Sequence, residues 1–201
     1  GQAGPMGQPA EKPRRATYAD LEAAPPNKVA ELIRGVLHVF PRPAPRHAYA
    51  ASSLGCELGG PFDLGKNGPG SFWILDGPEI HFPDPESPGD VDAVVPDIAG
   101  WRRERMPELP DTPYFSLAPD WICEILSPST EQHDREEKMP PYAREGVQHA
   151  WLVDPLHRTL EVFALRPGYG FTPIATHRDA ARVRAAPFQA IELELAVLWA
   201  T

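Results

Sequence analysis

The stretch Trp121-Ile122-Cys123-Glu124-Ile125-Leu126 decides the fold of this chain, because every residue in it is apolar except one carboxylate. A short, continuous apolar run of this length predicts a central β-strand that is buried on both faces. The sequence next predicts a helix over residues 129–139 and a further buried strand over residues 149–153. Strands that dominate, with a few helices between them, favour a single α/β domain in which helices flank a mixed β-sheet.

Turn signals divide the N-terminal half of the chain into short elements. The pair Arg34-Gly35 joins two β-type runs and predicts an N-terminal hairpin, and Asp76-Gly77 predicts a second hairpin in the same way. Helical spacing of apolar residues predicts a helix over residues 46–58, which Gly59-Gly60 is expected to end. Residues 91–98 are predicted to form one strand.

Length and composition limit the domain organisation. The 201 residues, 42% apolar and 23% charged, are typical of one globular domain. We predict a flexible N-terminal tail over residues 1–16 and a single domain over residues 17–201. The net charge of −9 argues against a tight, non-specific nucleic-acid binder, which needs a basic face.

Other classes of protein are disfavoured as well. No apolar run approaches the roughly 18 residues of a membrane span, and no signal-peptide pattern opens the chain. The two cysteines, Cys56 and Cys123, are too few for a disulfide scaffold. We therefore expect a cytoplasmic protein without a membrane partner.

Glu124 is the residue that most needs a chemical explanation. An ionised carboxylate in an apolar strand is costly unless it is paired or bound to a metal ion. Asp97 also follows an apolar run, so both carboxylates are expected at the ends of neighbouring strands. Mg²⁺ takes one or two carboxylates and completes its shell with water and substrate phosphate. The pair therefore predicts a metal site that polarises a phosphodiester and activates water.

Lys138 lies one helix beyond Glu124 and has two interpretations. A compact ammonium can lie beside an attacking water and orient it. Alternatively, Lys138 is a solvent-exposed helix residue that pairs with Asp134, four positions earlier. Spacing alone leaves both interpretations open.

Other polar residues are weaker candidates. Ser127, Ser129 and His133 suggest a nucleophilic hydrolase, but the G-x-S-x-G elbow is missing and serines before a helix usually cap it. His47 opens a helix and either faces a cleft or lies at the surface, with the surface position favoured. The arginines within residues 102–105 either grip phosphate or form a solvated loop.

These residues lie in segments that resemble the Uma2 family, formerly a domain of unknown function and described as restriction endonucleases. The likeness covers roughly residues 17–200, and its specific core lies within residues 94–155. The segments that carry it are Glu31-Leu32-Ile33-Arg34-Gly35, Val95-Pro96-Asp97, P-D-W-I-C-E-I-L-S-P-S-T (119–130), D-R-E-E-K (134–138), Y-A-R-E-G-V (142–147) and W-L-V-D-P (151–155).

The resemblance implies a restriction-endonuclease-like fold of the PD-(D/E)xK nuclease type. The usual E-x-K lysine position holds Leu126, and Lys138 on the following helix matches the lysine that has moved in this family. The implied catalytic residues are Asp97, Glu124, Lys138 and Glu31, and the implied metal ligands are Asp97, Glu124 and the backbone carbonyl of Ile125.

The function that the resemblance implies is a metal-dependent endonuclease that uses Mg²⁺ or Mn²⁺. Its expected partner is nucleic acid, with DNA favoured and bound weakly without metal. A homodimer is plausible because cutting a duplex needs two sites. The alternative is a catalytically degenerate nuclease fold that serves as a binding or assembly module. Pro140-Pro141 favours that alternative, because proline inside a helix costs about 3 kcal/mol and is expected to kink or end the helix beside Lys138.

Overall fold

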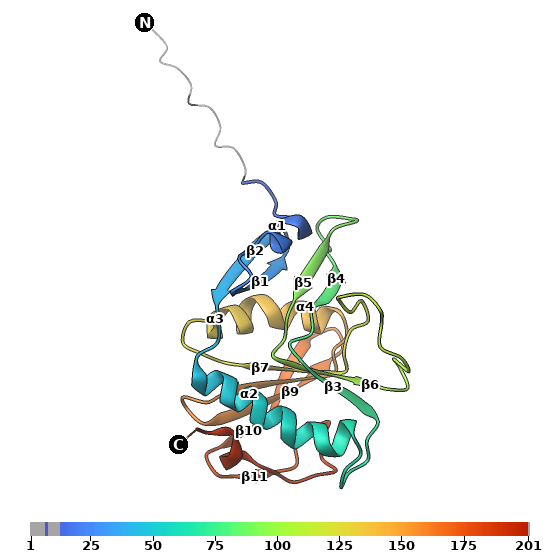
Figure 1. Ribbon diagram of the computed structural model, residues 1–201, viewed down its shortest axis with the longest axis vertical. Helices are drawn as coiled ribbons and strands as arrows, with labels where there is room; N and C mark the ends of the chain where they lie inside the picture. Colours follow the sequence, from blue (N-terminus) through green and yellow to red (C-terminus); the bar gives the residue numbers. More distant parts are fainter. Residues whose placement is uncertain (1–6, 8–12, 201) are drawn as a thin grey trace, which may run out of the picture.

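The computed structural model describes residue 7 and residues 13–200 of the chain, and it contains two large sheets and a small one (Figure 1). Figure 1 also shows helix α2 and the helix that runs from α3 to α4 on opposite sides of the larger sheet. The strands are β1 (Lys28–Ile33), β2 (Val36–Pro41), β3 (Phe72–Asp76), β4 (Ile80–Pro83), β5 (Val91–Val94), β6 (Ile98–Arg102), β7 (Trp121–Ile125), β8 (His149–Asp154), β9 (Thr159–Arg166), β10 (Gly170–Arg178), β11 (Arg182–Val183) and β12 (Leu193–Glu194). The helical segments are α1 (Tyr18–Glu22), α2 (Pro45–Leu58), η1 (Gly59–Asp63), α3 (Glu131–His133), η2 (Asp134–Lys138), α4 (Met139–Arg144) and η3 (Leu195–Leu198).

Strand pairing divides the chain between the two large sheets. The four-stranded sheet has the order β2-β1-β5-β4, and the six-stranded sheet has the order β10-β9-β8-β7-β6-β3. The two-stranded sheet pairs β11 with β12. The expected α/β class with a mixed sheet is confirmed, because β7 and β8 are parallel while their outer neighbours run antiparallel. The helical crossover between β7 and β8 is the connection that a parallel pair requires.

The predicted N-terminal hairpin is confirmed. β1 and β2 pair antiparallel from Lys28↔Pro41 to Ile33↔Val36. Arg34 and Gly35 form the turn, and both have positive φ angles of 49° and 73°. A two-residue hairpin loop of this kind needs such angles at both positions, which is why a glycine lies here.

Two predictions are wrong, namely the second hairpin at Asp76-Gly77 and the single strand over residues 91–98. β3 pairs with β6 in the larger sheet, whereas β4 pairs with β5 in the smaller one. The chain leaves the smaller sheet after Val94 and enters the larger sheet at Ile98. Pro96 lies at the crossing, where its missing N–H interrupts no ladder of hydrogen bonds. The crossing places Asp97 at the junction of the two sheets.

The central strand β7 is buried at all five positions, as its sequence predicts. Trp121, Cys123 and Ile125 pack in the core that contains Ala50, Leu54 and Leu58 of α2. Ile122 belongs to the opposite core, with Tyr142 of α4. Alternate residues of a strand face opposite sides, so Glu124 points to the same side as Ile122 and Tyr142.

The helix does not end at Pro140-Pro141, because helical structure continues from Glu131 to Arg144. The predicted kink stays a prediction. The prolines lie in the first turn of α4, where a missing N–H is tolerated. The preceding segment η2 is a π-helical turn, in which the Met139 N–H donates to the Asp134 carbonyl. Widening of this turn accommodates the proline pair and places Lys138 at its buried end.

Two boundaries differ from the sequence-based expectation. Helical structure after α2 passes through Gly59-Gly60 and ends at Asp63, as a π-helical segment. The predicted tail over residues 1–16 lies largely outside the described residues, and at its end the Ala16 N–H donates to the Gly35 carbonyl at 2.7 Å. The domain boundary therefore stays a prediction. No helix in the described part of the chain is long and apolar enough to cross a membrane.

Candidate functional site

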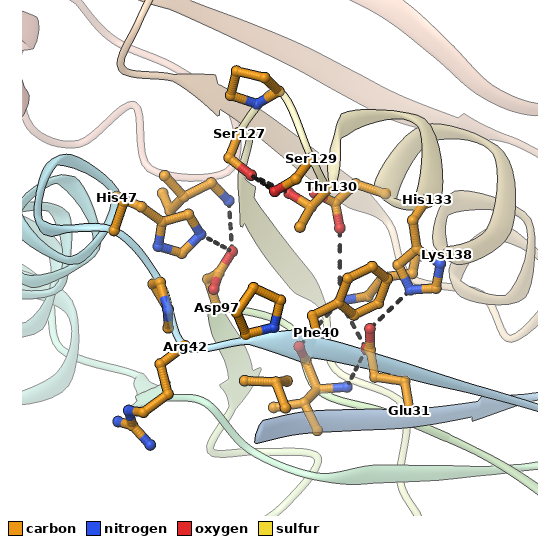
Figure 2. Close-up of a pocket in the computed structure, with 18 residues that line it drawn as sticks. Glu31, Phe40, Arg42, His47, Asp97, Ser127, Ser129, Thr130, His133 and Lys138 are labelled. Carbon is orange, nitrogen blue, oxygen red and sulfur yellow. Dashed lines mark hydrogen bonds and ion pairs between the residues drawn. The ribbon is translucent and has the colours of Figure 1, made fainter. Parts of the chain in front are cut away.

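A pocket of about 350 Å³ lies where the two sheets meet (Figure 2). The β1–β2 hairpin, the start of α2, the β5–β6 crossing and the segment after β7 form its walls. Its polar lining residues are Glu31, Arg42, His47, Asp97, Ser127, Ser129, Thr130, His133, Asp134 and Lys138.

Asp97 and Glu124 lie side by side because β6 and β7 are neighbours. The register pairs Ile98 with Cys123, which brings the preceding Asp97 opposite Glu124. The Asp97 N–H donates to Oε1 of Glu124 at 3.1 Å, and the Ile125 N–H donates to Oδ2 of Asp97 at 2.7 Å. This exchange of hydrogen bonds fixes both carboxylates at the strand ends.

The two carboxylates have different environments. The Asp97 side chain is 26% exposed and lines the pocket. The Glu124 side chain is only 1% exposed and lies behind the lining. Its Oε2 accepts a hydrogen bond from the Tyr142 hydroxyl at 3.3 Å and is 2.5 Å from the Lys138 ammonium.

Lys138 is buried, so its interpretation as a solvent-exposed helix residue is wrong. Its ammonium lies 2.5 Å from Oε2 of Glu124 and 2.9 Å from Oε2 of Glu31, and it donates to the Val95 carbonyl at 3.0 Å. The Val95 carbonyl accepts a hydrogen bond from the ammonium, and the carboxylates of Glu31 and Glu124 form ion pairs with it. Asp134 is more distant, with Oδ1 4.0 Å from the ammonium. The structure therefore brings Glu31, Glu124 and Lys138 together.

Glu31 lies on β1, and its contacts stabilise the negative charge of its carboxylate. Its Oε2 accepts the Val95 N–H at 2.8 Å, and Nε2 of His133 lies 2.9 Å from its Oε1. Burial alone would raise the pKa of Glu31, but the Lys138 ammonium and these hydrogen bonds hold it at about 2. Glu31 is therefore ionised over the whole physiological range.

Glu124 and Asp134 lie close to other carboxylates, whose negative charges repel theirs. Burial raises the pKa of Glu124 well above its ordinary value, and Lys138 opposes this shift. Burial also raises the pKa of Asp134 to about 7, with Lys138 opposing and Asp97 and Glu31 adding repulsion. One lysine thus balances four nearby carboxylates only in part, which favours the entry of a further cation.

His47 and Asp134 line the pocket, although the sequence favoured a surface position for each. His47 is not a surface histidine, because its side chain is 12% exposed and its Nε2 lies 3.4 Å from Oδ2 of Asp97. Helical spacing with the buried Ala50 and Leu54 could have placed it on the inner face of α2. Asp134 appeared only as a surface partner of Lys138, although their four-residue spacing places both on the same helix face.

The hydrolase alternative lacks a nucleophile–base pair. The Ser127 hydroxyl lies 2.8 Å from the Thr130 hydroxyl and 3.2 Å from that of Ser129, whereas His133 contacts Glu31. Ser129 does not cap the following helix, whose N-cap residue is Thr130 and forms no side-chain capping bond.

Two arginines of residues 102–105 form ion pairs with carboxylates outside the pocket. Arg103 pairs with Asp63 at 2.5 Å, and Arg105 pairs with Asp120 at 2.9 Å. Both follow the end of β6, whereas Asp97 precedes its start. These arginines therefore do not line the pocket.

The chemistry of the pocket fits a divalent cation with few protein ligands. Within residue 7 and residues 13–200, no three His, Cys, Asp or Glu side chains converge as a metal-binding group. Mg²⁺ and similar ions are nevertheless often held by one or two carboxylates, with water and phosphate as the other ligands. Asp97 offers an accessible carboxylate, and the surrounding negative charge favours a cation.

Comparisons with known proteins identify the family and the fold. The family model of Uma2, described as "Putative restriction endonuclease", matches residues 15–197. A crystal structure of a putative nuclease belonging to DUF820 from Anabaena variabilis is similar, with a TM-score of 0.70 and 22% sequence identity, covering 91% of this chain and 97% of that chain. This likeness confirms the expected nuclease-like fold. No curated protein matches the chain. Because the family model spans nearly all of the described residues, the chain belongs to the Uma2 family.

Proposed function

We propose that this protein is a metal-dependent endonuclease that hydrolyses phosphodiester bonds in nucleic acid, with DNA as the expected substrate. The observation that carries the proposal is the linked pair of Asp97 and Glu124 beside a pocket, with Lys138 buried against Glu124. The family description and the similar nuclease structure support a nucleic-acid substrate.

Asp97 and Glu124 are the proposed carboxylate ligands of Mg²⁺ or Mn²⁺, and the Ile125 carbonyl is the proposed third ligand. When bound, such an ion polarises the phosphodiester and lowers the pKa of a coordinated water. The Ile125 N–H holds one oxygen of Asp97 in place and leaves the other free of hydrogen bonds from the described residues. One oxygen of Asp97 therefore stays available to a metal ion in the pocket.

Lys138 and Glu31 are proposed to act together. Glu31 and Glu124 hold the ammonium on either side, so the lysine stays charged and close to the carboxylates. Burial alone would lower the pKa of Lys138, but Glu124 and Glu31 raise it well above its ordinary value. A protonated lysine can orient an attacking water but cannot accept its proton. This role requires an N–H of Lys138 to point into the pocket, which Lys138 lines.

A cleavage assay tests the proposal directly. Wild type, Asp97→Ala and Glu124→Ala are incubated with duplex DNA, single-stranded DNA or RNA, in Mg²⁺, Mn²⁺ or EDTA. We expect cleavage only by wild type and only with a divalent ion. Equal cleavage by all three proteins would contradict the assignment. The same samples, analysed by light scattering, test the proposed homodimer.

A second function, a binding or assembly module without catalysis, is favoured by one specific observation. Two ion pairs and a hydrogen bond to the Val95 carbonyl hold Lys138 in place, and Glu124 lies behind the pocket lining. The proline pair no longer supports this alternative, because the helix accommodates it. Calorimetry separates the two functions: absence of heat with millimolar Mg²⁺ and Mn²⁺, together with absence of cleavage, would favour the module.

A further inference from the structure

Asp134 differs from every other carboxylate in the pocket, because no described residue donates a hydrogen bond to its side chain. Asp97 accepts the Ile125 N–H, Glu31 accepts the Val95 N–H, and Glu124 accepts the Asp97 N–H. The Lys138 ammonium is the nearest cation to Asp134, and at 4.0 Å it is too distant for a hydrogen bond.

Burial makes the lack of hydrogen bonds to the Asp134 carboxylate energetically costly, because its one ion pair with a described residue, Lys138, is 4.0 Å long. Only 8% of its side chain is exposed, and it lines the pocket from the first residue of η2. A buried carboxylate without a partner carries a large desolvation penalty. Because Asp134 lies in the pocket wall, a ligand inside the pocket can supply the missing partner.

The charges around Asp134 define the chemistry of that ligand. Asp97 and Glu31 both repel the negative charge of Asp134. Asp97 also lines the pocket and is similar in one respect. Its Oδ1 accepts no hydrogen bond from the described residues. Two partly free carboxylates in one pocket favour a cation with oxygen ligands over an anion or a neutral group.

We propose that Asp134 is an additional ligand of the divalent cation and binds it together with Asp97. This inference rests on the proposed metal dependence and extends the metal site to a residue on the helix after β7. The ion would then connect the β5–β6 crossing to η2. It would also give the Asp134 carboxylate a close partner, which the described residues supply only as the Lys138 ammonium at 4.0 Å.

The test replaces Asp134 by cysteine and measures whether the protein then prefers a different metal ion. A thiolate is a soft ligand that favours Cd²⁺ over Mn²⁺, whereas a carboxylate is hard. Calorimetric dissociation constants for Mn²⁺ and Cd²⁺ are measured for wild type, Asp134→Cys and Glu136→Cys. Glu136 is exposed on the same helix and lies outside the pocket lining, so it is the matched control.

If Asp134 touches the ion, Asp134→Cys shifts the preference from Mn²⁺ toward Cd²⁺ by at least about tenfold relative to wild type. Glu136→Cys keeps the wild-type preference. If Asp134 acts only through its charge, Asp134→Cys weakens the binding of Mn²⁺ and Cd²⁺ to a similar extent. Equal metal preferences in all three proteins would therefore overturn the inference. Circular dichroism spectra establish that each variant is folded.

The cleavage assay keeps this inference separate from the proposed function. Metal-dependent cleavage by wild type, combined with an unchanged metal preference in Asp134→Cys, would overturn the inference and leave the proposed function in place. A shifted metal preference, without cleavage of any nucleic acid by wild type, would support the inference and overturn the proposed function.

Discussion

Asp134→Asn is expected to stabilise the metal-free protein above neutral pH. Burial, with added repulsion from Asp97 and Glu31, raises the pKa of Asp134 from 3.8 to about 7 despite the attraction of Lys138. The folded protein therefore keeps a proton that the unfolded chain loses near pH 4. The stability that protonated Asp134 contributes to the folded state is fully present below about pH 4. It is lost as the pH rises through about 7.

The magnitude follows from the size of the pKa difference. Each pKa unit corresponds to about 1.36 kcal/mol, so a difference of about 3 units costs about 4 kcal/mol once Asp134 is ionised in the folded state. Asparagine has nearly the same shape and cannot ionise. The variant should therefore exceed wild type in unfolding free energy by about 4 kcal/mol at about pH 8, and by roughly half that or less at about pH 5.

Urea unfolding in EDTA, followed by circular dichroism, measures these differences. Glu136→Gln removes one charge from the exposed side of the same helix and is expected to change stability by less than about 0.5 kcal/mol. A variant Asp134→Asn that is no more stable than wild type at about pH 8, with an unchanged slope against urea, would refute the reasoning.

Three further results are expected. Glu31→Gln should lose about 3 kcal/mol of unfolding free energy at about pH 7, since the pKa of Glu31 is about 2 instead of 4.5, and the loss should shrink as pH falls from 4.5 toward 2 in urea titrations. Lys138→Met should cost roughly 3–5 kcal/mol, because Glu31 and Glu124 lose their shared cation, and the double variant with Glu31→Gln should recover part of that loss in thermal melts. Maleimide should label Cys56 and spare Cys123, a buried thiol whose pKa is raised by burial, as mass spectrometry of the folded protein would show.

Local patterns predicted the centre of the fold, but they did not predict how the strands pair. The burial of β7 follows from its apolar run, and the β1–β2 hairpin follows from Arg34-Gly35. Asp76-Gly77 is an equally good local turn signal, yet its two strands belong to different sheets. Strand pairing depends on contacts that are distant in sequence, and no turn signal contains that information.

The helix after β7 shows a second limit of sequence reasoning. Proline usually disrupts a helix, so Pro140-Pro141 predicts an end or a kink. The π-helical turn over residues 134–138 instead accommodates the pair, which lies in the first turn of α4. This widening decides where Lys138 lies, and spacing along the sequence could not predict it.

The candidate site could be predicted in part. The resemblance to the family indicated Asp97, Glu124, Lys138 and Glu31, and the structure links Glu124 to each of the other three directly or through Lys138. Their catalytic and metal-binding roles stay predictions. That no described residue donates a hydrogen bond to the Asp134 side chain became visible only in three dimensions, because it depends on which donors the neighbouring strands direct elsewhere.

The most direct measurement of the central claim is the rate of plasmid DNA cleavage in Mn²⁺ by wild type and by Asp97→Asn. Asparagine keeps the shape of the side chain and can still accept the Ile125 N–H, so the fold should persist. We expect wild type to cleave the plasmid and Asp97→Asn to be at least about a hundredfold slower, which corresponds to a loss of roughly 2.7 kcal/mol of transition-state stabilisation. Equal rates for the two proteins, or no cleavage by wild type in either Mn²⁺ or Mg²⁺, would contradict it.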